Sequence, residues 1–474
     1  MDGRKTKIVC TIGPVTQSEE MLEGLARSGM NVVRLNMSHG THEEKAKLIE
    51  TVRNIRKAMG IPLAIMIDVE GPKIRTGELK EEIVHLKKGE ELVLTIESIV
   101  GDQRKISIDY AGLPKDVKKG DKILMNDGLV ALEVLSTTDK EIRTLILNDG
   151  DITHHRGINV PGVDLKIPPF TSKDIEDLKF AARMKPEYIA QSFVRKAEDV
   201  LKAKQILAEN GMKNARIISK IETRQALENL EEILDVSDGA MVARGDLGVE
   251  IDAEDLPLAQ KRIIKECNKR ALPVITATQM LESMVNNPRP TRAEVTDVAN
   301  AVLDGTDAVM LSEETAVGKY PLEAVKFMDR IAKKAEILLE TDRKGKFTPV
   351  KCDRISDAIS LSAWQLSVEL KSKVIVASTS SGLTARHVSR LRPSATILSP
   401  TPSLETYHAM ALVWGVLPVL IDKVNSTDEM VSLSVEKLVA LGLAKPGDTF
   451  VLTAGIPWGV SGTTNMIKVE EVPS

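Results

Sequence analysis

Several residue types and motifs are scarce in this sequence of 474 residues, and each shortage excludes a class of protein. The three cysteines, Cys10, Cys267 and Cys352, are too scattered for a disulfide framework or a cysteine metal site. No apolar run approaches the ~18 residues of a membrane-spanning helix, and the N-terminus has no secretory apolar segment. A formal net charge of -4 provides no basic field for nucleic acid. The sequence therefore predicts a cytoplasmic protein with neither nucleic acid nor a membrane as partner.

Short motifs of several common catalytic classes are also absent. The sequence has no Walker A pattern, no G-x-G-x-x-G, no H-E-x-x-H and no C-x-x-C. It has no nucleophile elbow to support a Ser-His-Asp hydrolase. His39 and the pair His154-His155 have no partner at metal-ligand spacing, so these histidines are expected on the surface or in a lid.

Eight short, mostly apolar runs recur along the chain, with helical patterns such as Ser18–Ser28 and Leu256–Lys269 between most of them. Continuous apolar runs are typical of parallel strands that helices cover on both faces. Eight such units predict a (β/α)8 barrel with its site at the carboxyl ends of the strands. The predicted strands are Lys5–Cys10, Asn31–Leu35, Leu63–Asp68, Glu187–Ser192, Ala215–Lys220, Gly239–Ala243, Pro273–Ala277 and Asp307–Leu311.

Two segments depart from this alternation. About 95 residues between the third and fourth runs contain short strand-like runs and polar turns, which indicates an inserted small β-barrel. After a charged linker, Thr341–Phe347, strands alternate with helices as in an open α/β domain. We therefore predict an α/β chain with a catalytic TIM barrel over 1–72 and 168–338, a small β-barrel lid over 73–167, and an open α/β regulatory domain over 339–474.

Charged residues follow several of the predicted barrel strands. Glu222 and Asp246 are carboxylates at neighbouring strand ends, and such oxygens suit Mg²⁺ or Mn²⁺. Lys220 lies on the same face of its strand as Glu222 and could stabilise a phosphoryl group or an enolate. The alternative is structural: each acid pairs with a base, and Lys220 pairs with Glu222 itself.

Other groups at the same strand ends suit an anion. Arg34 and Arg75 can bind phosphate or carboxylate as forks. The backbone of Ala243, Arg244, Gly245 and Asp246 can approach an anion closely, and Thr278 adds a hydroxyl. Together these groups predict a small substrate that carries both phosphate and carboxylate.

The segments that contain these residues resemble the pyruvate kinase family along essentially the whole chain and in order. The matching segments are TIGP (11–14), RLNMSHG (34–40), GPKIRTG (71–77), GINVPG (157–162), SKIE (219–222), MVARGDLG (241–248), ATQMLESM (277–284) and the run from Pro290 to Pro321. The resemblance implies phosphoryl transfer from phosphoenolpyruvate to ADP, giving pyruvate and ATP, and the homotetramer that is usual in the family.

The resemblance also implies roles for individual residues. Glu222 and Asp246 hold the divalent metal, and Ala243–Asp246 with Thr278 hold the substrate carboxylate. A water near Thr278 and Ser312 relays a proton to the enolate. The phosphoryl clamp consists of Arg34, Arg75 and Lys220. The nucleotide-contact set consists of Asn36, His39, Arg75, Arg156 and Lys173.

One motif departs from the family pattern. Asn36, Ser38, Asp68 and the carbonyl of Val69 match the position of a monovalent cation in potassium-activated members. Those members usually have glutamate after Gly-Pro, where this chain has Lys73. We predict that the Lys73 ammonium substitutes for potassium, so that K⁺ is not required.

A second site is expected in the C-terminal domain. The predicted strand Val374–Ala377 leads into a hydroxyl-rich loop that opens a helix, which suits a phosphate; the alternative is a hydroxyl-capped turn. The loop matches the activator site of regulated family members, and its effector residues are Ser378, Thr379, Ser380, Ser381, Gly382 and Thr384. The facing loop, Gly455–Asn465, has no basic residue for a second phosphate, which favours AMP or a sugar monophosphate over fructose 1,6-bisphosphate.

Two other functions fit parts of this pattern. A metal-dependent lyase or aldolase of the same barrel type would share the acids and the carboxylate nest, but it would have neither the insertion nor the C-terminal domain. A non-catalytic metabolite-binding protein should have lost Lys220, a metal acid or Thr278, and all of these residues are present.

Overall fold

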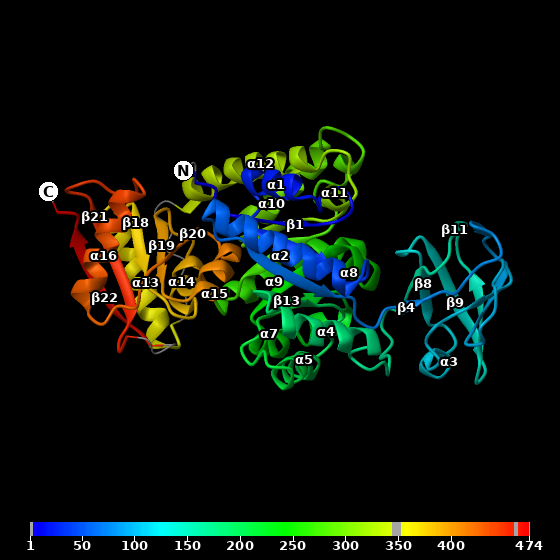
Figure 1. The fold of residues 1–474 in the computed structure, drawn as a ribbon. Coiled ribbons are helices and arrows are strands. Elements are labelled where there is room, and N and C mark those ends of the chain that lie inside the picture. Colours follow the sequence, from blue (N-terminus) through cyan, green and yellow to red (C-terminus); the bar gives the residue numbers. More distant parts are fainter. Residues whose placement is uncertain (1–2, 344–351, 459–462, 474) are drawn as a thin grey trace.

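A computed structural model describes residues 3–343, 352–458 and 463–473. In Figure 1 a barrel lies in the centre, a mostly β segment extends from one side of it, and an α/β domain lies on the opposite side. No helix among the described residues is long and apolar enough to cross a bilayer.

The barrel is closed by parallel strands in the order β1-β17-β16-β15-β14-β13-β3-β2, which confirms the predicted (β/α)8 fold. Most residues of these strands are fully buried, because helices cover the outside and side chains fill the interior. The strands are β1 (Lys7–Thr11), β2 (Val32–Asn36), β3 (Ala64–Val69), β13 (Tyr188–Gln191), β14 (Ile217–Ile221), β15 (Gly239–Ala243), β16 (Val274–Ala277) and β17 (Ala308–Leu311).

Local capping defines several of the barrel helices. Thr41 and Glu44 form a capping box at the start of α2, and Gly60 ends this helix in a left-handed conformation. The helices are α1 (Glu19–Ser28), α2 (His42–Met59), α4 (Ser172–Met184), α5 (Ala197–Glu209), α6 (Arg224–Glu228), α7 (Leu230–Val236), α8 (Arg244–Glu250), α9 (Leu256–Lys269), α10 (Arg292–Asp304), α11 (Glu313–Ala316) and α12 (Pro321–Arg343). Because α12 continues to Arg343, the expected linker is helical over 341–343, and its residues 344–347 lie outside the described part of the chain.

The inserted segment forms a curled seven-stranded sheet, in the order β4-β12-β8-β9-β10-β6-β7, with β5 and β11 as a separate pair. An isolated bridge between Thr76 and Ile108 joins the two edges, so the sheet approaches the predicted barrel. Buried and exposed residues alternate along β9 and β10, as expected for strands with one buried face. The elements are β4 (Ile74–Arg75), β5 (Val84–Leu86), β6 (Glu91–Thr95), β7 (Lys105–Ser107), α3 (Leu113–Asp116), β8 (Lys122–Met125), β9 (Val130–Thr137), β10 (Glu141–Ile146), β11 (Gly150–Ile152) and β12 (Gly157–Asn159). We call this segment the inserted sheet.

The C-terminal domain contains a five-stranded sheet in the order β20-β19-β18-β21-β22. The first four strands are parallel and β22 is antiparallel to β21. The elements are α13 (Ile355–Glu369), β18 (Val374–Ala377), α14 (Leu383–Ser389), β19 (Thr396–Thr401), α15 (Leu404–Ala409), β20 (Val416–Leu420), α16 (Thr427–Ala440), β21 (Thr449–Gly455) and β22 (Thr464–Glu471).

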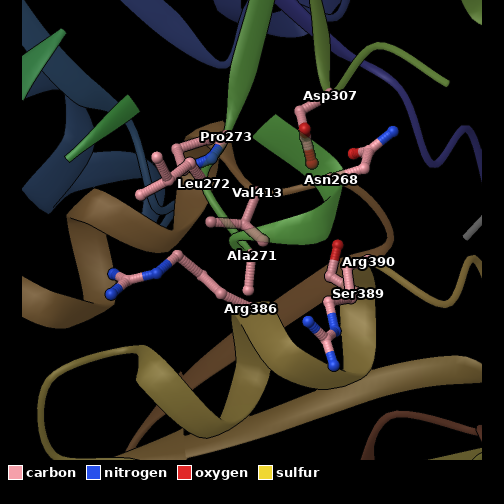
Figure 2. A pocket seen from close by; sticks show the side chains of 9 residues that line it. All are labelled: Asn268, Ala271, Leu272, Pro273, Asp307, Arg386, Ser389, Arg390 and Val413. Carbon is pink, nitrogen blue, oxygen red and sulfur yellow. The ribbon is translucent and has the colours of Figure 1, made fainter. Parts of the chain in front are cut away.

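The C-terminal domain packs on the base of the barrel, at the amino ends of its strands. Arg392 donates to both carboxylate oxygens of Asp307, at 3.0 and 3.1 Å, and Tyr188 donates to the carbonyl of Ala409 at 2.8 Å. Figure 2 shows a cavity at this junction, with Asp307 on one side and, on the other, Arg386 of α14 and Arg390, which directly follows α14. Because Asp307 comes just before β17, this cavity lies at the opposite end of the barrel from the predicted catalytic groups.

Candidate active site

The carboxyl ends of the barrel strands bring together charged side chains from distant parts of the sequence. Arg34 lies on β2, Asp68 on β3 and Lys220 on β14, while Glu222 directly follows β14. Asp246 lies in the first turn of α8, directly after β15. Parallel strands point the same way around the barrel, so side chains separated by up to about two hundred residues share one end of it.

Lys220 lies at the centre of this cluster. Its Nζ donates to Ser192 Oγ at 2.6 Å and lies 2.9 Å from Glu222 Oε1 and 3.5 Å from Asp68 Oδ1. Burial lowers the pKa of Lys220, but the charges of Asp68 and Glu222 outweigh burial, and the net pKa is raised. Lys220 is therefore a fixed ammonium group.

Arg34 and Asp68 form a second buried pair. Arg34 Nε donates to Asp68 Oδ2 at 2.6 Å, and its Nη1 donates to Thr11 Oγ1 at 2.9 Å. Burial raises the pKa of Asp68, but the charges of Lys220 and Arg34 reverse this effect, and the net pKa is lowered. Asp68 therefore stays ionised and orients both cations.

Glu222 and Asp246 have the chemistry of a divalent-metal site. Glu222 is fully buried, its Oε2 accepts from the amide of Phe193 at 2.7 Å, and its Oε1 lies 2.9 Å from the Lys220 ammonium. Burial raises the pKa of Glu222, Lys220 opposes this change, and the charge of Asp246 adds to it. A bound cation would offset both the free-energy cost of burying the charged Glu222 carboxylate and the repulsion between the two acids.

The two acids alone do not make a complete metal cage. No group of three or more His, Cys, Asp or Glu side chains within residues 3–343, 352–458 and 463–473 is arranged to hold a metal. Mg²⁺ is usually bound by one or two carboxylates and keeps several waters or substrate oxygens. The residues present therefore fit Mg²⁺ or Mn²⁺ shared with a substrate.

The predicted carboxylate nest lies beside these acids. Thr278 has a left-handed backbone (φ 64), and its Oγ1 accepts from the amide of Gly245 at 2.8 Å and donates to the carbonyl of Ala277 at 2.7 Å. The Arg244 side chain turns towards the carbonyls of Ala277 and Thr278 and towards Asp297 Oδ2, at 3.1, 2.6 and 2.6 Å. Arg244 thus supports the Thr278 loop with its side chain, and its backbone alone is placed to face a substrate.

Ser312 follows β17, at the same end of the barrel. Its amide donates to Glu314 Oε2 at 2.7 Å, and the other oxygen of Glu314 accepts from the amide of Leu281 at 3.0 Å. Glu314 therefore fixes the loops after β16 and β17, which contain Thr278 and Ser312.

Arg75 is held by Glu70 and by the backbone of the inserted segment. Its Nη2 donates to Glu70 Oε1 at 2.6 Å and its Nη1 to the carbonyl of His155 at 3.2 Å. The residue belongs to β4 of the inserted sheet, so its distance from the cluster depends on the position of that sheet.

Lys73 pairs with Asp246, one of the two predicted metal acids. Its Nζ donates to Asp246 Oδ1 at 2.8 Å and lies 3.8 Å from Asp127 Oδ1. Among the described residues, Lys73 forms ion pairs with Asp246 and Asp127 but not with Asp68. Asp68 is instead paired with Arg34 and Lys220. The physical reason is that Asp246 is a carboxylate without another cation within ion-pair distance in that part of the chain.

The other residues of the predicted monovalent-cation position lie at or just after the ends of β2 and β3. Asn36 Oδ1 accepts from the amide of Ser38 at 3.0 Å. Asp68 and Val69 are the last two residues of β3. These four residues lie next to one another because β2 pairs with β3, with Asn36 opposite Asp68.

The residues of the predicted nucleotide set belong partly to the barrel and partly to the inserted segment. Lys173 Nζ donates to the carbonyl of Met37 at 2.6 Å and lies 3.9 Å from Glu70 Oε2, the partner of Arg75. Arg156 precedes β12, and its carbonyl accepts from the amide of Thr76 at 2.8 Å. His39 is exposed in the turn after β2.

The predicted effector loop is a tightly bonded turn. Thr379 Oγ1 accepts from the amide of Gly382 at 2.8 Å, and the carbonyl of Ser380 accepts from Thr406 Oγ1 at 2.9 Å. Thr384 and Thr464 share a hydrogen bond of 2.7 Å. Ser378 is buried and Ser381 half-buried. Residues 459–462 of the facing loop lie outside the described residues.

The sequence interpretation missed Ser192 and Thr11 as members of the cluster. Ser192 bonds Lys220 and also lies 3.4 Å from Asp68 Oδ1, while Thr11 accepts from Arg34. The sequence did offer a sign of both residues, because each is a hydroxyl residue at the carboxyl end of a barrel strand: Thr11 at the first strand and Ser192 at the fourth. Comparable hydroxyls occur on many strands, so position alone did not distinguish these two.

The closed barrel and its charged end define a (β/α)8-barrel phosphotransferase. Residues 3–325 match the family model described as "Pyruvate kinase, barrel domain", and residues 357–470 match "Pyruvate kinase, alpha/beta domain". The chain belongs to the pyruvate kinase family.

Relatives resemble the chain over nearly its full length. A pyruvate kinase of Thermotoga maritima is 50% identical over 469 residues, covering 99% of this chain and 100% of the relative. A pyruvate kinase of Staphylococcus aureus is 47% identical over 476 residues, covering 99% of this chain and 80% of the relative. A crystal structure of a pyruvate kinase from Cryptosporidium parvum has a TM-score of 0.91 and 38% identity, covering 99% of this chain and 96% of that one.

Proposed function

We propose that the protein transfers the phosphoryl group of phosphoenolpyruvate to ADP, giving pyruvate and ATP, with Mg²⁺ or Mn²⁺ as the divalent ion. The observation that carries this proposal is the cluster at the carboxyl end of the barrel. Phosphoryl transfer proceeds through a loose transition state, so it needs positioning and charge neutralisation more than a protein nucleophile. The cluster consists of Arg34, Asp68, Lys73, Lys220, Glu222 and Asp246.

The fixed ammonium of Lys220 and the guanidinium of Arg34 would hold the transferring phosphoryl group. As the bond to the enol oxygen breaks and a bond to the terminal phosphate oxygen of ADP forms, Lys220 would also stabilise the enolate. Glu222 and Asp246 would hold the divalent ion, which supplies charge neutralisation for the phosphoryl and carboxylate oxygens. The enolate then takes a proton at carbon.

The loop groups complete the substrate site. The backbone of Ala243–Asp246 and the Thr278 hydroxyl would hold the carboxylate of phosphoenolpyruvate, and a water near Thr278 and Ser312 would deliver the proton. Asn36, His39, Arg75, Arg156 and Lys173 would contact the nucleotide as the inserted sheet closes as a lid and excludes water. The corresponding division of the chain is a catalytic barrel of 1–72 and 168–338, a lid of 73–167 and a regulatory domain of 339–474.

A coupled assay of the full chain with phosphoenolpyruvate, ADP and Mg²⁺ tests the proposal. Lys220→Met should reduce turnover by about 10³-fold because it removes the main cation of the cluster. Lys179→Met is the matched control, since Lys179 pairs with Glu176 on the exposed face of α4. Absence of ATP formation by the unmodified protein would refute the proposed reaction.

We also propose that the protein does not need potassium. Asp68, the acid of the predicted monovalent position, already lies 2.6 Å from Arg34 and 3.5 Å from Lys220. Lys73 adds a positive charge that stays on the protein whether or not it is paired with Asp246. Activity in tetramethylammonium salts should equal activity in potassium salts, and Lys73→Glu should become potassium-dependent. Collapse of the unmodified activity without potassium contradicts this proposal.

A phosphorylated effector, either AMP or a sugar monophosphate, is proposed for the loop of Ser378, Thr379, Ser380, Ser381, Gly382 and Thr384. The support is the loop's place between β18 and the start of α14, and its match to the activator loop of the family. Titrating each compound against substrate-saturation curves tests it, with Thr384→Val as the variant that should lose the response. Identical curves with and without every effector contradict it.

We further propose that the protein is a cytoplasmic homotetramer that associates through exposed apolar side chains of the C-terminal domain. Ile355, Val368 and Leu370, on and just after α13, are 72%, 52% and 44% exposed, and Val469 on the edge strand β22 is 41% exposed. Exposed apolar side chains beside an unpaired strand edge favour contact with a second copy of the chain. Light scattering of the unmodified protein should give the mass of a tetramer. The double variant Ile355→Lys with Val469→Lys should have a lower mass. A monomeric mass for the unmodified protein contradicts the proposed tetramer.

A further inference from the structure

We propose that Lys73 is an internal counter-ion of the divalent-metal site. In the metal-free protein the Lys73 ammonium is paired with Asp246, and it has to leave when a divalent ion binds there. Lys73 therefore lowers the affinity for the metal. It also links the metal site to the inserted sheet. The inference rests on the proposed function in one respect, which is that Glu222 and Asp246 are the metal acids.

Each metal acid is paired with a lysine, but the two pairs differ in how firmly the lysine is held. Lys220, 2.9 Å from Glu222, is also bonded to Ser192 at 2.6 Å and lies near Asp68. Lys73, 2.8 Å from Asp246, has one other ion pair in the described part of the chain, at 3.8 Å to the 72% exposed Asp127. Lys73 is therefore the cation that can be displaced.

The cluster is charge-balanced before a metal enters. Three cations balance the three acids. The shortest pairs are Arg34–Asp68 at 2.6 Å, Lys220–Glu222 at 2.9 Å and Lys73–Asp246 at 2.8 Å, and Lys220 also lies 3.5 Å from Asp68. A divalent ion at Asp246 would lie beside the Lys73 ammonium in a partly buried site, where repulsion between cations is only weakly screened. Metal binding consequently competes with the Lys73–Asp246 pair.

The side chain of Lys73 also links the barrel to the inserted sheet. Lys73 directly precedes β4 in the chain. Its side chain runs past Gly157 of β12, where an added Cβ would lie 2.5 Å from Lys73 Cε. The glycine at position 157 therefore leaves room for the lysine side chain. On the barrel side the ammonium lies 5.9 Å from the ring of Phe193. Displacement of the ammonium from Asp246 therefore removes an ion pair between the inserted sheet and the barrel.

The experiment measures Mn²⁺ binding to the full-length protein by the electron paramagnetic resonance of free Mn²⁺, without substrate. Lys73→Met, which keeps the length and removes the charge, should bind Mn²⁺ roughly tenfold more tightly than the unmodified protein, and Lys73→Arg should bind it as the unmodified protein does. The matched control is Lys80→Met, because Lys80 is another lysine of the inserted segment and pairs with Asp102 instead. Equal or weaker Mn²⁺ binding by both Lys73→Met and a second variant, Lys73→Gln, would overturn the inference.

Two further measurements separate this inference from the proposed function. Glu222→Gln should weaken Mn²⁺ binding. If Mn²⁺ binding is unchanged, the metal is not bound by these acids and the inference fails. That result would leave the proposed reaction intact if the coupled assay still shows ATP formation. Hydrogen exchange of β4 and β12 should accelerate when Mn²⁺ binds the unmodified protein and should change less in Lys73→Met. Exchange that is insensitive to Mn²⁺ in the unmodified protein would overturn the link to the inserted sheet.

Discussion

Lys7 gives a stability prediction that can be worked out from the structure. It begins β1 at the base of the barrel, is 8% exposed, and donates to the carbonyl of Val416 in the C-terminal domain at 2.9 Å. Burial lowers the pKa of Lys7 to about 7; Arg4 lowers it further, and Glu336 and Asp307 oppose this. The perturbation is Lys7→Met, which keeps the apolar stem and removes the amine.

The sign follows from the difference between the folded and unfolded chain. An unfolded lysine titrates near pH 10.4, so between about pH 7 and 10 the unfolded chain binds a proton that folded Lys7 does not. The free energy of unfolding therefore rises with pH in this window, by about 1.4 kcal/mol per unit. Relative to Lys7→Met, the unmodified protein should gain roughly 2–3 kcal/mol between pH 7 and 9. Well below pH 7 both states are protonated, and the difference should be constant.

Urea unfolding of both proteins at pH 6, 7, 8 and 9, followed by far-ultraviolet circular dichroism, measures this difference. Subtracting the variant from the unmodified protein cancels the other titrating groups, because the two chains differ at one residue. Lys326→Met on α12 is an exposed control that should show no pH-dependent difference. An equal difference for Lys7→Met at pH 6 and pH 9 would refute the reasoning.

Three other substitutions have defined outcomes. Arg392→Met leaves Asp307 buried without its main cation and should lower the urea-unfolding free energy by about 3–5 kcal/mol, with part recovered on adding Asp307→Asn; a change below 1 kcal/mol, or no recovery, argues against this role. Gly13→Ala places a Cβ 2.5 Å from the carbonyl oxygen of Ala316 and should destabilise the protein by about 1–3 kcal/mol in thermal melts, whereas an unchanged midpoint contradicts the clash. Thr278→Ala should lower kcat roughly 100-fold in steady-state assays with an unchanged circular-dichroism spectrum, and near-normal kcat excludes the Thr278 hydroxyl from the reaction.

The barrel and most of the strands were predictable because each has a strong local signal. The Gly239–Ala243 and Val374–Ala377 strands were predicted at their observed bounds, since continuous apolar residues mark buried strands. The two-residue strand β4 was missed because it is too short to show a period. The strand β22, with the sequence TNMIKVEE, was also missed. It is an exposed edge strand, so it contains polar residues and has no continuous apolar run that would mark it as a strand.

The candidate site was predictable as a set of residues but not as a set of contacts. Arg34, Lys220, Glu222 and Asp246 were found because a parallel barrel directs every strand end to one side. The contact of Glu222 with Lys220 was one of the alternatives considered, and the structure has it at 2.9 Å. The pairing of Lys73 with Asp246 was not foreseen, since the two residues are 173 positions apart and belong to different parts of the fold.

The sequence by itself determined the eight-strand barrel, the inserted sheet, the C-terminal domain and the family, because strand runs, turn residues and motifs are local properties of the chain. Only the tertiary structure decided which cation faces which acid. Asp68 faces Arg34 and Lys220, while Lys73 lies on Asp246. The physical reason is that an ion pair depends on separations of a few ångströms, and these arise when strand ends and the inserted sheet meet in space.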